Sequence, residues 1–298
     1  MGTVLSDLSA AMAAMVDLAG ESIVRVEGRR GRPASGIVWS AGGEIVTASH
    51  AVSREEGMVV GLPGGDKLEA RLVGRDPAAD IAVLRAAATG LKAPAWLPIE
   101  EARVGHLVLA LGRPGKTVQA TLGVISALGG EWRTPEGSLV ERYLQTDVVM
   151  YPGFSGGPLV GADGRVVGLN TSGLARGVSL ALPAATLQRV VPMLLTHGHI
   201  RRGYLGIGAQ PVRLPEDIAG QLGQETGVLI VSVEPGGPAA TAGLTLGDTL
   251  VGLAGAPIRH MDDLMAALGG DRIGQPLAAR LLRAGKLQEM RVTAGERP

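Results

Sequence analysis

The sequence predicts a mainly β protein with two small barrels, followed by a third unit that mixes strands with a helix. Three observations lead to this fold class. Glycine and proline supply 46 and 18 of the 298 residues, whereas aromatic residues supply only 2%. Short apolar runs of Val, Ile, Leu and Ala recur along the chain, and turns that contain Gly, Pro or Asp separate them. Many short strands joined by such turns are typical of barrels and sandwiches.

The first block of strands extends from Ser22 to Ala86. Its six runs read SIVRV, SGIVWS, EIVTA, GMVVGL, KLEARLVG and DIAVLRA. Six short strands favour a small closed barrel. Two polar residues lie at strand ends in this block, because His50 follows the third run and Asp80 opens the sixth.

A second block, from Leu107 to Leu182, has the same character and predicts another barrel. The pair Asp163-Gly164 predicts a hairpin turn within it. An apolar helix led by proline is expected from Pro183 to Leu195.

The outer parts of the chain differ from the two blocks. Apolar side chains recur at helical spacing between Leu5 and Leu18, which predicts an amphipathic N-terminal helix. Near the C-terminus, strands alternate with a helix expected from Met261 to Leu268. The predicted boundaries are therefore 1–20 for the N-terminal helix, 21–196 for the double barrel, 197–202 for a linker and 203–298 for the third unit.

Glycines flank one serine closely in the stretch Gly153-Phe154-Ser155-Gly156-Gly157-Pro158-Leu159. No side chain of the neighbouring glycines blocks a substrate backbone, and glycine adopts positive φ at little steric cost. A serine hydroxyl needs a base within hydrogen-bond reach to act as a nucleophile at neutral pH, and backbone N–H groups around it can form an oxyanion hole. The stretch therefore predicts a catalytic nucleophile at Ser155.

The chain order His50, Asp80, Ser155 is that of the chymotrypsin class, which places its site between two barrels. The surrounding strings TASHAV, DPAADIAVL and QTD through GFSGGPL closely resemble the bacterial HtrA (Deg) serine proteases. The resemblance continues through TLGVISALG and ALP to the third unit. There, YLGI resembles the carboxylate-binding loop of a PDZ domain, and AGL with GD resembles its central signature. The family implies a chymotrypsin-like double β-barrel protease domain followed by an α+β PDZ domain.

The resemblance also implies roles for the three residues. His50 takes the Ser155 proton and returns it to the leaving amine, while Asp80 holds the imidazole tautomer. The oxyanion hole is expected in the loop that runs through Gly153, Phe154 and Ser155, chiefly from the N–H groups of the first and last.

Specificity is predicted from Val149, which lies where this class has the floor of the pocket for the P1 side chain, the one before the cleaved bond. A charged P1 side chain would meet no partner at an apolar floor. We therefore expect a small to medium apolar P1 residue.

Phe154 departs from the family pattern, because HtrA relatives usually carry asparagine before the serine. An aromatic ring cannot pair with a newly cut N-terminal amine, so activation by that route is excluded. Two interpretations stay open: the ring packs under the loop, or it holds the oxyanion N–H groups in a resting orientation. The second favours an alternative function, a catalytically silent scaffold whose PDZ domain recruits partners.

The stretch Gly153 to Gly157 also matches the G-x-S-x-G elbow of an α/β-hydrolase. That fold requires an acid and then a histidine after the serine, in a regular strand–helix alternation that this sequence lacks.

In the third unit, the resemblance implies that Tyr204, Leu205, Gly206 and Ile207 bind the C-terminus of a peptide, chiefly through the N–H groups of the last three. The helical stripe Leu264, Met265 and Leu268 fits the wall of a peptide groove and a core-facing helix side equally well.

The function implied by the resemblance is that of a serine endopeptidase that needs no ATP or other cofactor and takes unfolded or misfolded proteins. The PDZ domain would bind apolar C-termini and regulate activity in protein quality control. Because HtrA relatives commonly assemble through the N-terminal part of the protease domain, a homotrimer is expected.

Composition limits the other partners. Lys+Arg and Asp+Glu both number 28, so no basic field indicates a nucleic-acid partner. Cysteine is absent, and His197 and His199 lack nearby carboxylates, so no metal site is expected. No stretch has the pattern of a membrane span or a signal peptide. The family usually occurs in the cell envelope or periplasm, and a cytoplasmic location stays open for this chain.

Overall fold

The computed structural model describes residues 3–29, 31–134, 137–175 and 177–296. The outermost residues of the predicted N-terminal and C-terminal segments, 1–2 and 297–298, lie outside the described residues. Contacts divide the chain into two units, residues 1–200 and 201–298. The division falls inside the segment 197–202 that the sequence predicts as a linker.

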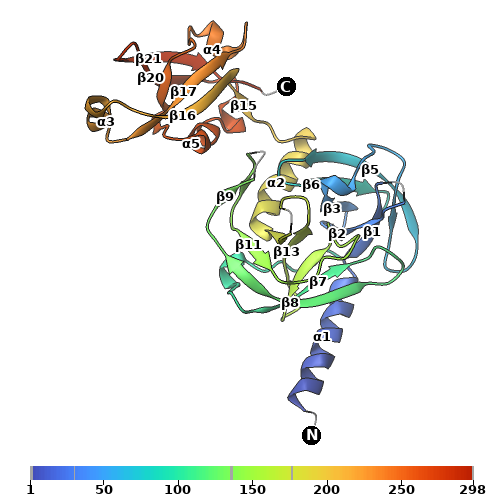
Figure 1. Cartoon of the computed structure of the whole chain (residues 1–298). Coiled ribbons are helices and arrows are strands. Elements are labelled where there is room, and N and C mark those ends of the chain that lie inside the picture. Colours follow the sequence, from blue (N-terminus) through green and yellow to red (C-terminus); the bar gives the residue numbers. More distant parts are fainter. Residues whose placement is uncertain (1–2, 30, 135–136, 176, 297–298) are drawn as a thin grey trace. The chain divides into compact units, whose positions relative to one another are not determined.

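The first block forms a closed barrel (Figure 1). Its strands pair antiparallel in the order β1-β2-β3-β6-β5-β4, and the prediction of six strands is confirmed. The third strand runs directly into a short 3₁₀ turn, η1 (Ser49–Ala51), that carries His50. The strand bounds are β1 Ile23–Glu27, β2 Ala34–Val38, β3 Glu44–Ala48, β4 Met58–Gly61, β5 Lys67–Asp76 and β6 Ile81–Ala86.

The second block closes into another barrel, in the order β11-β14-β13-β12-β7-β8. A two-stranded hairpin, β9 (Trp132–Arg133) with β10 (Leu139–Val140), stands outside it. A second 3₁₀ turn, η2 (Ile99–Glu101), precedes the barrel. The barrel strands are β7 Leu107–Gly112, β8 Gln119–Leu128, β11 Leu144–Thr146, β12 Pro158–Gly161, β13 Val166–Thr171 and β14 Ser179–Pro183.

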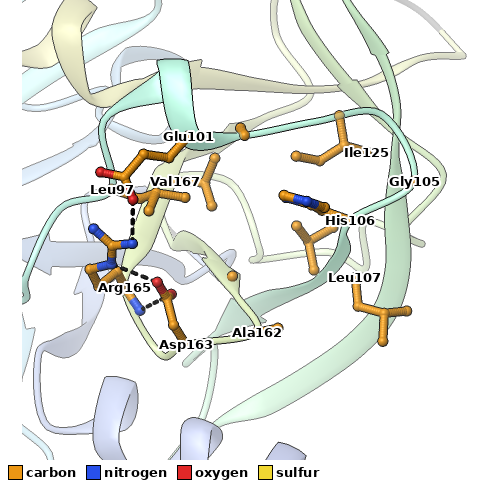
Figure 2. Close-up of a pocket in the computed structure, with 13 residues that line it drawn as sticks. Leu97, Glu101, Gly105, His106, Leu107, Ile125, Ala162, Asp163, Arg165 and Val167 are labelled. Atoms are coloured by element: carbon orange, nitrogen blue, oxygen red, sulfur yellow. Dashed lines mark hydrogen bonds and ion pairs between the residues drawn. The ribbon is translucent and has the colours of Figure 1, made fainter.

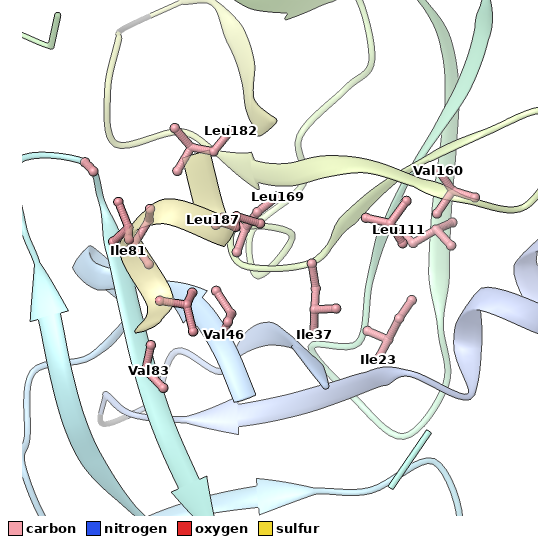
Figure 3. Packing of buried hydrophobic residues seen from close by; sticks show 14 of the residues in the cluster. Ile23, Ile37, Val46, Ile81, Val83, Leu111, Val160, Leu169, Leu182 and Leu187 are labelled. Carbon is pink, nitrogen blue, oxygen red and sulfur yellow. The ribbon is translucent and has the colours of Figure 1, made fainter. Parts of the chain in front are cut away.

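One apolar core joins the two barrels. Strands β2, β12 and β13 are buried along their whole length, so both faces of these strands are covered. Figure 3 shows the buried side chains of this shared core meeting from both barrels and from α2 (Ala184–His197). The first barrel contributes Ile23, Ile37, Val46, Ile81 and Val83, the second Leu111, Val160, Leu169 and Leu182, and the helix Leu187, Val190, Val191 and Leu194.

The two helices of this unit differ in their burial. α2 packs against β5 and β6 of one barrel and β13 and β14 of the other, and it ends at Gly198 in the left-handed conformation with φ 77°. α1 (Val4–Gly20) begins at the Thr3 cap, and its early residues Val4 and Leu5 are largely exposed. Further along, Met12 and Met15 pack against the shared core. Within the described residues, no helix combines the length and the apolar character that spanning a bilayer requires.

The second unit is a sheet with helices, as predicted for the third unit of the sequence. Its strands run in the order β16-β17-β18-β20-β21, with β19 added to β18, so that β16 is an edge strand. Pro211 lies within this edge strand. The helices are α3 Glu216–Leu222, α4 Pro238–Thr241 and α5 Met261–Ala267, with the 3₁₀ turn η3 Gly270–Arg272. The strands are β15 Gly203–Tyr204, β16 Ile207–Arg213, β17 Thr226–Val233, β18 Thr249–Leu253, β19 Ala256–Pro257, β20 Pro276–Arg283, β21 Lys286–Thr293 and β22 Gly295–Glu296, and β22 pairs with β15.

An ion pair fixes the PDZ-like signature within this sheet. Asp248 is buried, and its carboxylate accepts hydrogen bonds from Arg283 Nε at 2.7 Å and from Thr245 N at 2.8 Å. Burial alone would raise the pKa of Asp248, but the hydrogen bonds from Arg283 and Thr245 outweigh it and hold that pKa below its ordinary value.

The shared core predicts a specific stability effect. Replacing Leu169, which is fully buried on β13, by alanine should lower the free energy of unfolding of the first unit by about 2–5 kcal/mol, since it leaves a cavity between the barrels. All three tryptophans lie in this unit, so urea unfolding followed by tryptophan fluorescence measures it alone. The matched control is Leu122→Ala, because Leu122 on β8 is 51% exposed and its loss should cost about 0.5 kcal/mol or less. Equal losses for both variants would contradict a core shared by the barrels.

Candidate active site

His50 and Asp80 form a direct pair at the ends of two neighbouring strands, β3 and β6. The His50 Nδ1 atom lies 2.8 Å and 3.0 Å from the two carboxylate oxygens of Asp80, and the His50 backbone N–H donates to the same carboxylate at 2.9 Å. Asp80 is only 4% exposed. It has φ 56°, a left-handed conformation that aspartate tolerates better than most residues. A ring nitrogen bonded to a carboxylate carries the proton, so the other nitrogen, Nε2, is left as the acceptor.

Two residues at the end of β13 complete the surroundings of this pair. The Thr171 hydroxyl donates to Asp80 and accepts a hydrogen bond from Gly173 N at 3.0 Å. A Cβ atom on Gly173 would lie 2.7 Å from Asp80 Oδ2 and 2.8 Å from His50 Nδ1. Only glycine therefore fits at this position beside the histidine–aspartate pair.

Neither Thr171 nor Gly173 was predicted from the sequence. The signal available for them was their position directly after the apolar run of β13, the strand that pairs with the one following Ser155.

The glycines around Ser155 let the loop pack against other backbone segments. Gly153 and Gly156 have φ of 92° and 85°, which fits the positive φ that the sequence favours for these glycines. A Cβ atom on Gly156 would lie 2.2 Å from the Ser35 carbonyl oxygen, and one on Gly157 would lie 2.2 Å from the Leu111 carbonyl oxygen. These glycines therefore serve close backbone packing as well as open access.

The Ser155 hydroxyl lies in the same cleft as His50. The cleft has a volume of about 650 Å³, and its lining includes His50, Ser155 and Ser172. In the part of the chain that the structure describes, the one hydrogen-bond partner of Ser155 Oγ is Ser172 Oγ, at 3.0 Å. The structure thus brings all three predicted residues together, with the serine hydroxyl turned to Ser172 and not bonded to the histidine ring.

Phe154 packs under the loop, which is the first of the two interpretations drawn from the sequence. Its side chain is fully buried in the core of the second barrel, and its ring meets that of Tyr151 edge-on with centroids 5.8 Å apart. The Phe154 N–H donates to the Tyr151 carbonyl at 3.0 Å. Phe154 is therefore removed from the predicted set of oxyanion donors, since its N–H is already bonded.

The other two predicted donors keep free N–H groups. The N–H groups of Gly153 and Ser155 donate to none of the residues that the structure describes. The Gly153 carbonyl accepts a hydrogen bond from the Ser35 hydroxyl at 2.7 Å, which fixes the orientation of this part of the loop.

Val149, the predicted floor of the P1 pocket, lies in the loop between β11 and β12. Its side chain is 55% exposed and is not part of the cleft lining, whereas Met150 and Tyr151 are. The Val149 carbonyl accepts a hydrogen bond from the Thr121 hydroxyl at 2.9 Å, and the neighbouring Val148 side chain is the buried one. Because β11 ends at Thr146 and Val149 lies in the loop that follows, its role in the P1 pocket stays a prediction.

The loop predicted to bind a carboxylate lies at the start of the second unit. The Leu205 carbonyl accepts from Ala239 N and the Gly206 carbonyl accepts from Glu234 N, each at 2.8 Å, and Gly206 has φ 73°. Among the described residues, the N–H groups of Leu205 and Gly206 have no acceptor. Unpaired N–H groups beside a left-handed residue are the pattern of an anion-binding nest.

The rest of the predicted PDZ site is divided between loop and core. Ile207 begins the edge strand β16, opposite Val233, and the Tyr204 hydroxyl donates to Glu234. Leu264 and Leu268 are buried in the core of this unit, and Met265 is half-buried. The stripe therefore faces the core at its two leucines.

A second hollow, of about 500 Å³, opens on the second barrel (Figure 2). Its floor is apolar, and Figure 2 shows His106 on one side and Arg165 on the other. Arg165 donates to Glu101 and Asp163, each at 2.6 Å, and these bonds raise the pKa of Arg165 above its ordinary value. Because the Arg165 guanidinium is already paired with two carboxylates, this hollow has fewer groups free to bind or react than the cleft at Ser155.

No metal site emerges from the described ranges, where no group of three or more histidine, aspartate or glutamate side chains is placed to hold an ion.

Comparison with known families identifies both units. A family model described as a trypsin-like peptidase domain matches residues 34–169, and one described as a PDZ domain matches residues 203–294.

Curated relatives match both parts at once. A protein of Ectopseudomonas mendocina named as a DegP-like periplasmic serine endoprotease is 36% identical over 272 residues, which is 89% of this chain and 56% of that protein. The serine protease named HhoB of Synechocystis is 34% identical over 278 residues, 89% of this chain and 66% of that protein. The chain therefore spans between about half and two thirds of the length of these relatives.

Solved structures match nearly the whole chain. The crystal structure of the serine endoprotease from Yersinia pestis has a TM-score of 0.79 and 30% identity, and the match covers 96% of this chain and 98% of that one. The HtrA-type protease AlgW, solved with a decapeptide, also has a TM-score of 0.79, with 27% identity over 96% of this chain and 98% of that one.

The tight packing at Gly173 predicts a test of the histidine–aspartate pair. In Gly173→Ala, the new methyl group would overlap Asp80 and His50 and force them apart. The low-field ¹H NMR signal of the His50 Nδ1 proton should therefore disappear. Gly64→Ala is the control, because a Cβ atom there meets no atom within 4 Å and the signal should stay. An unchanged signal in Gly173→Ala would mean that the pair does not depend on this contact.

Proposed function

Because this chain belongs to the HtrA family of trypsin-like serine proteases with a PDZ domain, we propose that it is a serine endopeptidase that uses His50, Asp80 and Ser155. The observation that carries the proposal is the His50–Asp80 pair in the same cleft as the Ser155 hydroxyl. The two unbonded N–H groups of Gly153 and Ser155 support it as oxyanion donors.

The proposed reaction follows from these groups. His50 Nε2 takes the hydroxyl proton as Ser155 Oγ bonds to the carbonyl carbon of the peptide bond, and the carbonyl oxygen gains a negative charge. The N–H groups of Gly153 and Ser155 stabilise that charge. When the C–N bond breaks, His50 gives its proton to the leaving amine. Water, activated by the same ring, then releases the acyl group and restores the hydroxyl.

Asp80 serves this cycle by holding the imidazole. Its bond to Nδ1 keeps Nε2 directed to the nucleophile and stabilises the ring when it is protonated. The bonds from Thr171 and the His50 backbone hold the carboxylate in turn, so the ring has few other orientations.

The substrates that we propose are unfolded or misfolded proteins, as the family implies. The apolar side chains of Met150 and Tyr151 in the cleft support an apolar P1 residue. In the second unit, the unpaired N–H groups of Leu205 and Gly206 support capture of a peptide C-terminus, and the edge strand β16 is open to strand addition. The AlgW structures solved with peptides are consistent with such binding.

Assembly and location are proposed on the same basis. The exposed apolar side chains of Val4 and Leu5 at the start of α1 support assembly through this end, for which we propose a homotrimer. The relative named as periplasmic supports a place in the cell envelope or periplasm.

The silent-scaffold alternative loses its single support. Phe154 favoured it in the sequence, but the ring is buried in the core and does not line the cleft.

The test of the function compares the wild type with Ser155→Ala. The wild type should react with a fluorophosphonate probe at Ser155 and digest unfolded casein. Ser155→Ala should lose the label, and its turnover should fall by about 10⁴- to 10⁶-fold because the nucleophile is gone. An unlabelled, inactive wild type in every oligomeric state would remove the proposal.

The same variant separates catalysis from recruitment. Ser155→Ala should bind short apolar peptides with a free C-terminal carboxylate as tightly as the wild type does, measured by fluorescence anisotropy. The control peptide carries a C-terminal amide, which offers no anion to the N–H groups of Leu205 and Gly206.

Ser172 should restrain the nucleophile, since the Ser155 hydroxyl must leave it to reach His50. A neutral hydrogen bond contributes about 0.5–1.5 kcal/mol, so Ser172→Ala should raise the rate of fluorophosphonate labelling about two- to tenfold. Ser172→Thr keeps a hydroxyl and should label at a rate near that of the wild type. Slower labelling of Ser172→Ala would show that Ser172 assists the nucleophile and does not restrain it.

A further inference from the structure

The cleft at Ser155 carries unbalanced positive charge. Its lining includes Arg29 and Arg32 but no aspartate or glutamate, although acidic and basic residues balance over the whole sequence. In the described part of the chain, neither guanidinium forms an ion pair with a carboxylate. Two unpaired guanidinium groups in one cleft favour a ligand that carries carboxylates.

Arg29 is fixed to the backbone of the proposed base. Its Nη1 atom donates to the His50 carbonyl oxygen at 2.9 Å, and its side chain is half-buried. Arg32 lies on the same loop between β1 and β2, is exposed, and has no hydrogen bond to the described residues. Arg29 therefore gives the loop a defined place beside His50, while Arg32 stays available to a ligand.

The proposed reaction indicates which part of the substrate lies near the two arginines. His50 hands its proton to the leaving amine, so the peptide that leaves runs past His50. Met150, Tyr151 and Pro152 line the cleft from the segment that leads to Ser155, which bonds to the acyl group, whereas Arg29 is bonded to the backbone of His50. The two arginines thus accompany the part of the substrate that follows the cleaved bond.

We propose that Arg29 and Arg32 form a carboxylate-binding subsite on the leaving-group side of the cleft. The enzyme then prefers peptide bonds that are followed, within the first few residues, by a carboxylate. Two sources carry this group: the side chains of Asp and Glu, and the free terminus of a short leaving fragment. This inference rests on the proposed endopeptidase function and adds a substrate class to it.

The subsite acts in one half of the reaction. It contacts the leaving peptide while the acyl bond to Ser155 forms, and that peptide has left before water attacks. Its effect therefore appears in kcat/KM, which includes acylation, and is absent from the hydrolysis of the acyl group. Because Arg32 is exposed, added salt weakens the preference.

The test uses internally quenched peptides that share one sequence before the cleaved bond. One pair carries Asp-Glu or Asn-Gln after the bond and ends in an amide. A second pair carries neutral residues after the bond and ends in a free carboxylate or an amide. Rates are divided by the concentration of active sites titrated with fluorophosphonate, so that misfolded protein does not affect the comparison.

For the wild type, at least one carboxylate peptide should exceed its neutral partner about three- to tenfold in kcat/KM at low salt, and the ratio should shrink at about 0.5 M salt. The first pair reports side chains and the second reports termini. Arg32→Lys keeps the charge and should keep most of the ratio, whereas Arg32→Glu should abolish or invert it. Arg103→Glu is the matched control, because Arg103 is exposed and lies outside the cleft lining; its ratio should equal that of the wild type.

Equal kcat/KM values within both pairs would overturn the subsite, and so would a ratio that persists in Arg32→Glu. Either result leaves the endopeptidase function intact, because the peptides are still cleaved. The function itself fails if the wild type cleaves none of these peptides and does not react with fluorophosphonate.

Discussion

The apolar core that the two barrels share is the constraint on which the site depends. His50 and Asp80 lie at strand ends of the first barrel, and Ser155 lies in a loop of the second. None of the three fixes the distance between the barrels. Buried side chains from eight barrel strands and α2 do so, because a close-packed interior tolerates little displacement. The hydrophobic effect thus supplies the precision that the chemistry requires, far from the reacting atoms.

The end of β13 links the two halves of the site. Thr171 donates a hydrogen bond to the buried carboxylate of Asp80, and the next residue, Ser172, is hydrogen-bonded to the Ser155 hydroxyl. Gly173 then passes beside the histidine ring without a side chain. Three successive residues of the second barrel therefore contact both halves of the site. The buried Asp80 carboxylate has three hydrogen-bond donors and, among the described residues, forms no ion pair with a lysine or arginine, so it depends on these contacts to stay in place.

Much of the fold and of the candidate site could be predicted from the sequence, but the contacts within the site could not. Six apolar runs with turns give the strands, and the order of His50 and Ser155 in their strings gives the family. The contacts of Ser172 and Gly173 could not be predicted, since they exist only once β13 lies beside the first barrel. The role given to Val149 stays a prediction, because a count along the chain gives an offset from Ser155 but not how the loop turns. The periodicity of apolar residues predicts helices and strands. The orientation of a side chain depends on residues that lie far away in the sequence and that only the fold brings close.

Pro211 limits what the edge strand β16 can accept. Proline in an edge strand turns its nitrogen, which has no hydrogen to donate, to the open side. Backbone pairing by an added strand, starting at the loop of Leu205 and Gly206, is therefore interrupted after about Gln210. Under the proposed peptide binding, only the last few residues of a tail would pair with the strand, so very different proteins with the same terminal residues would be equivalent ligands. The same missing donor blunts this edge against pairing with the edge of another molecule, which is the usual route from an open sheet edge to aggregation.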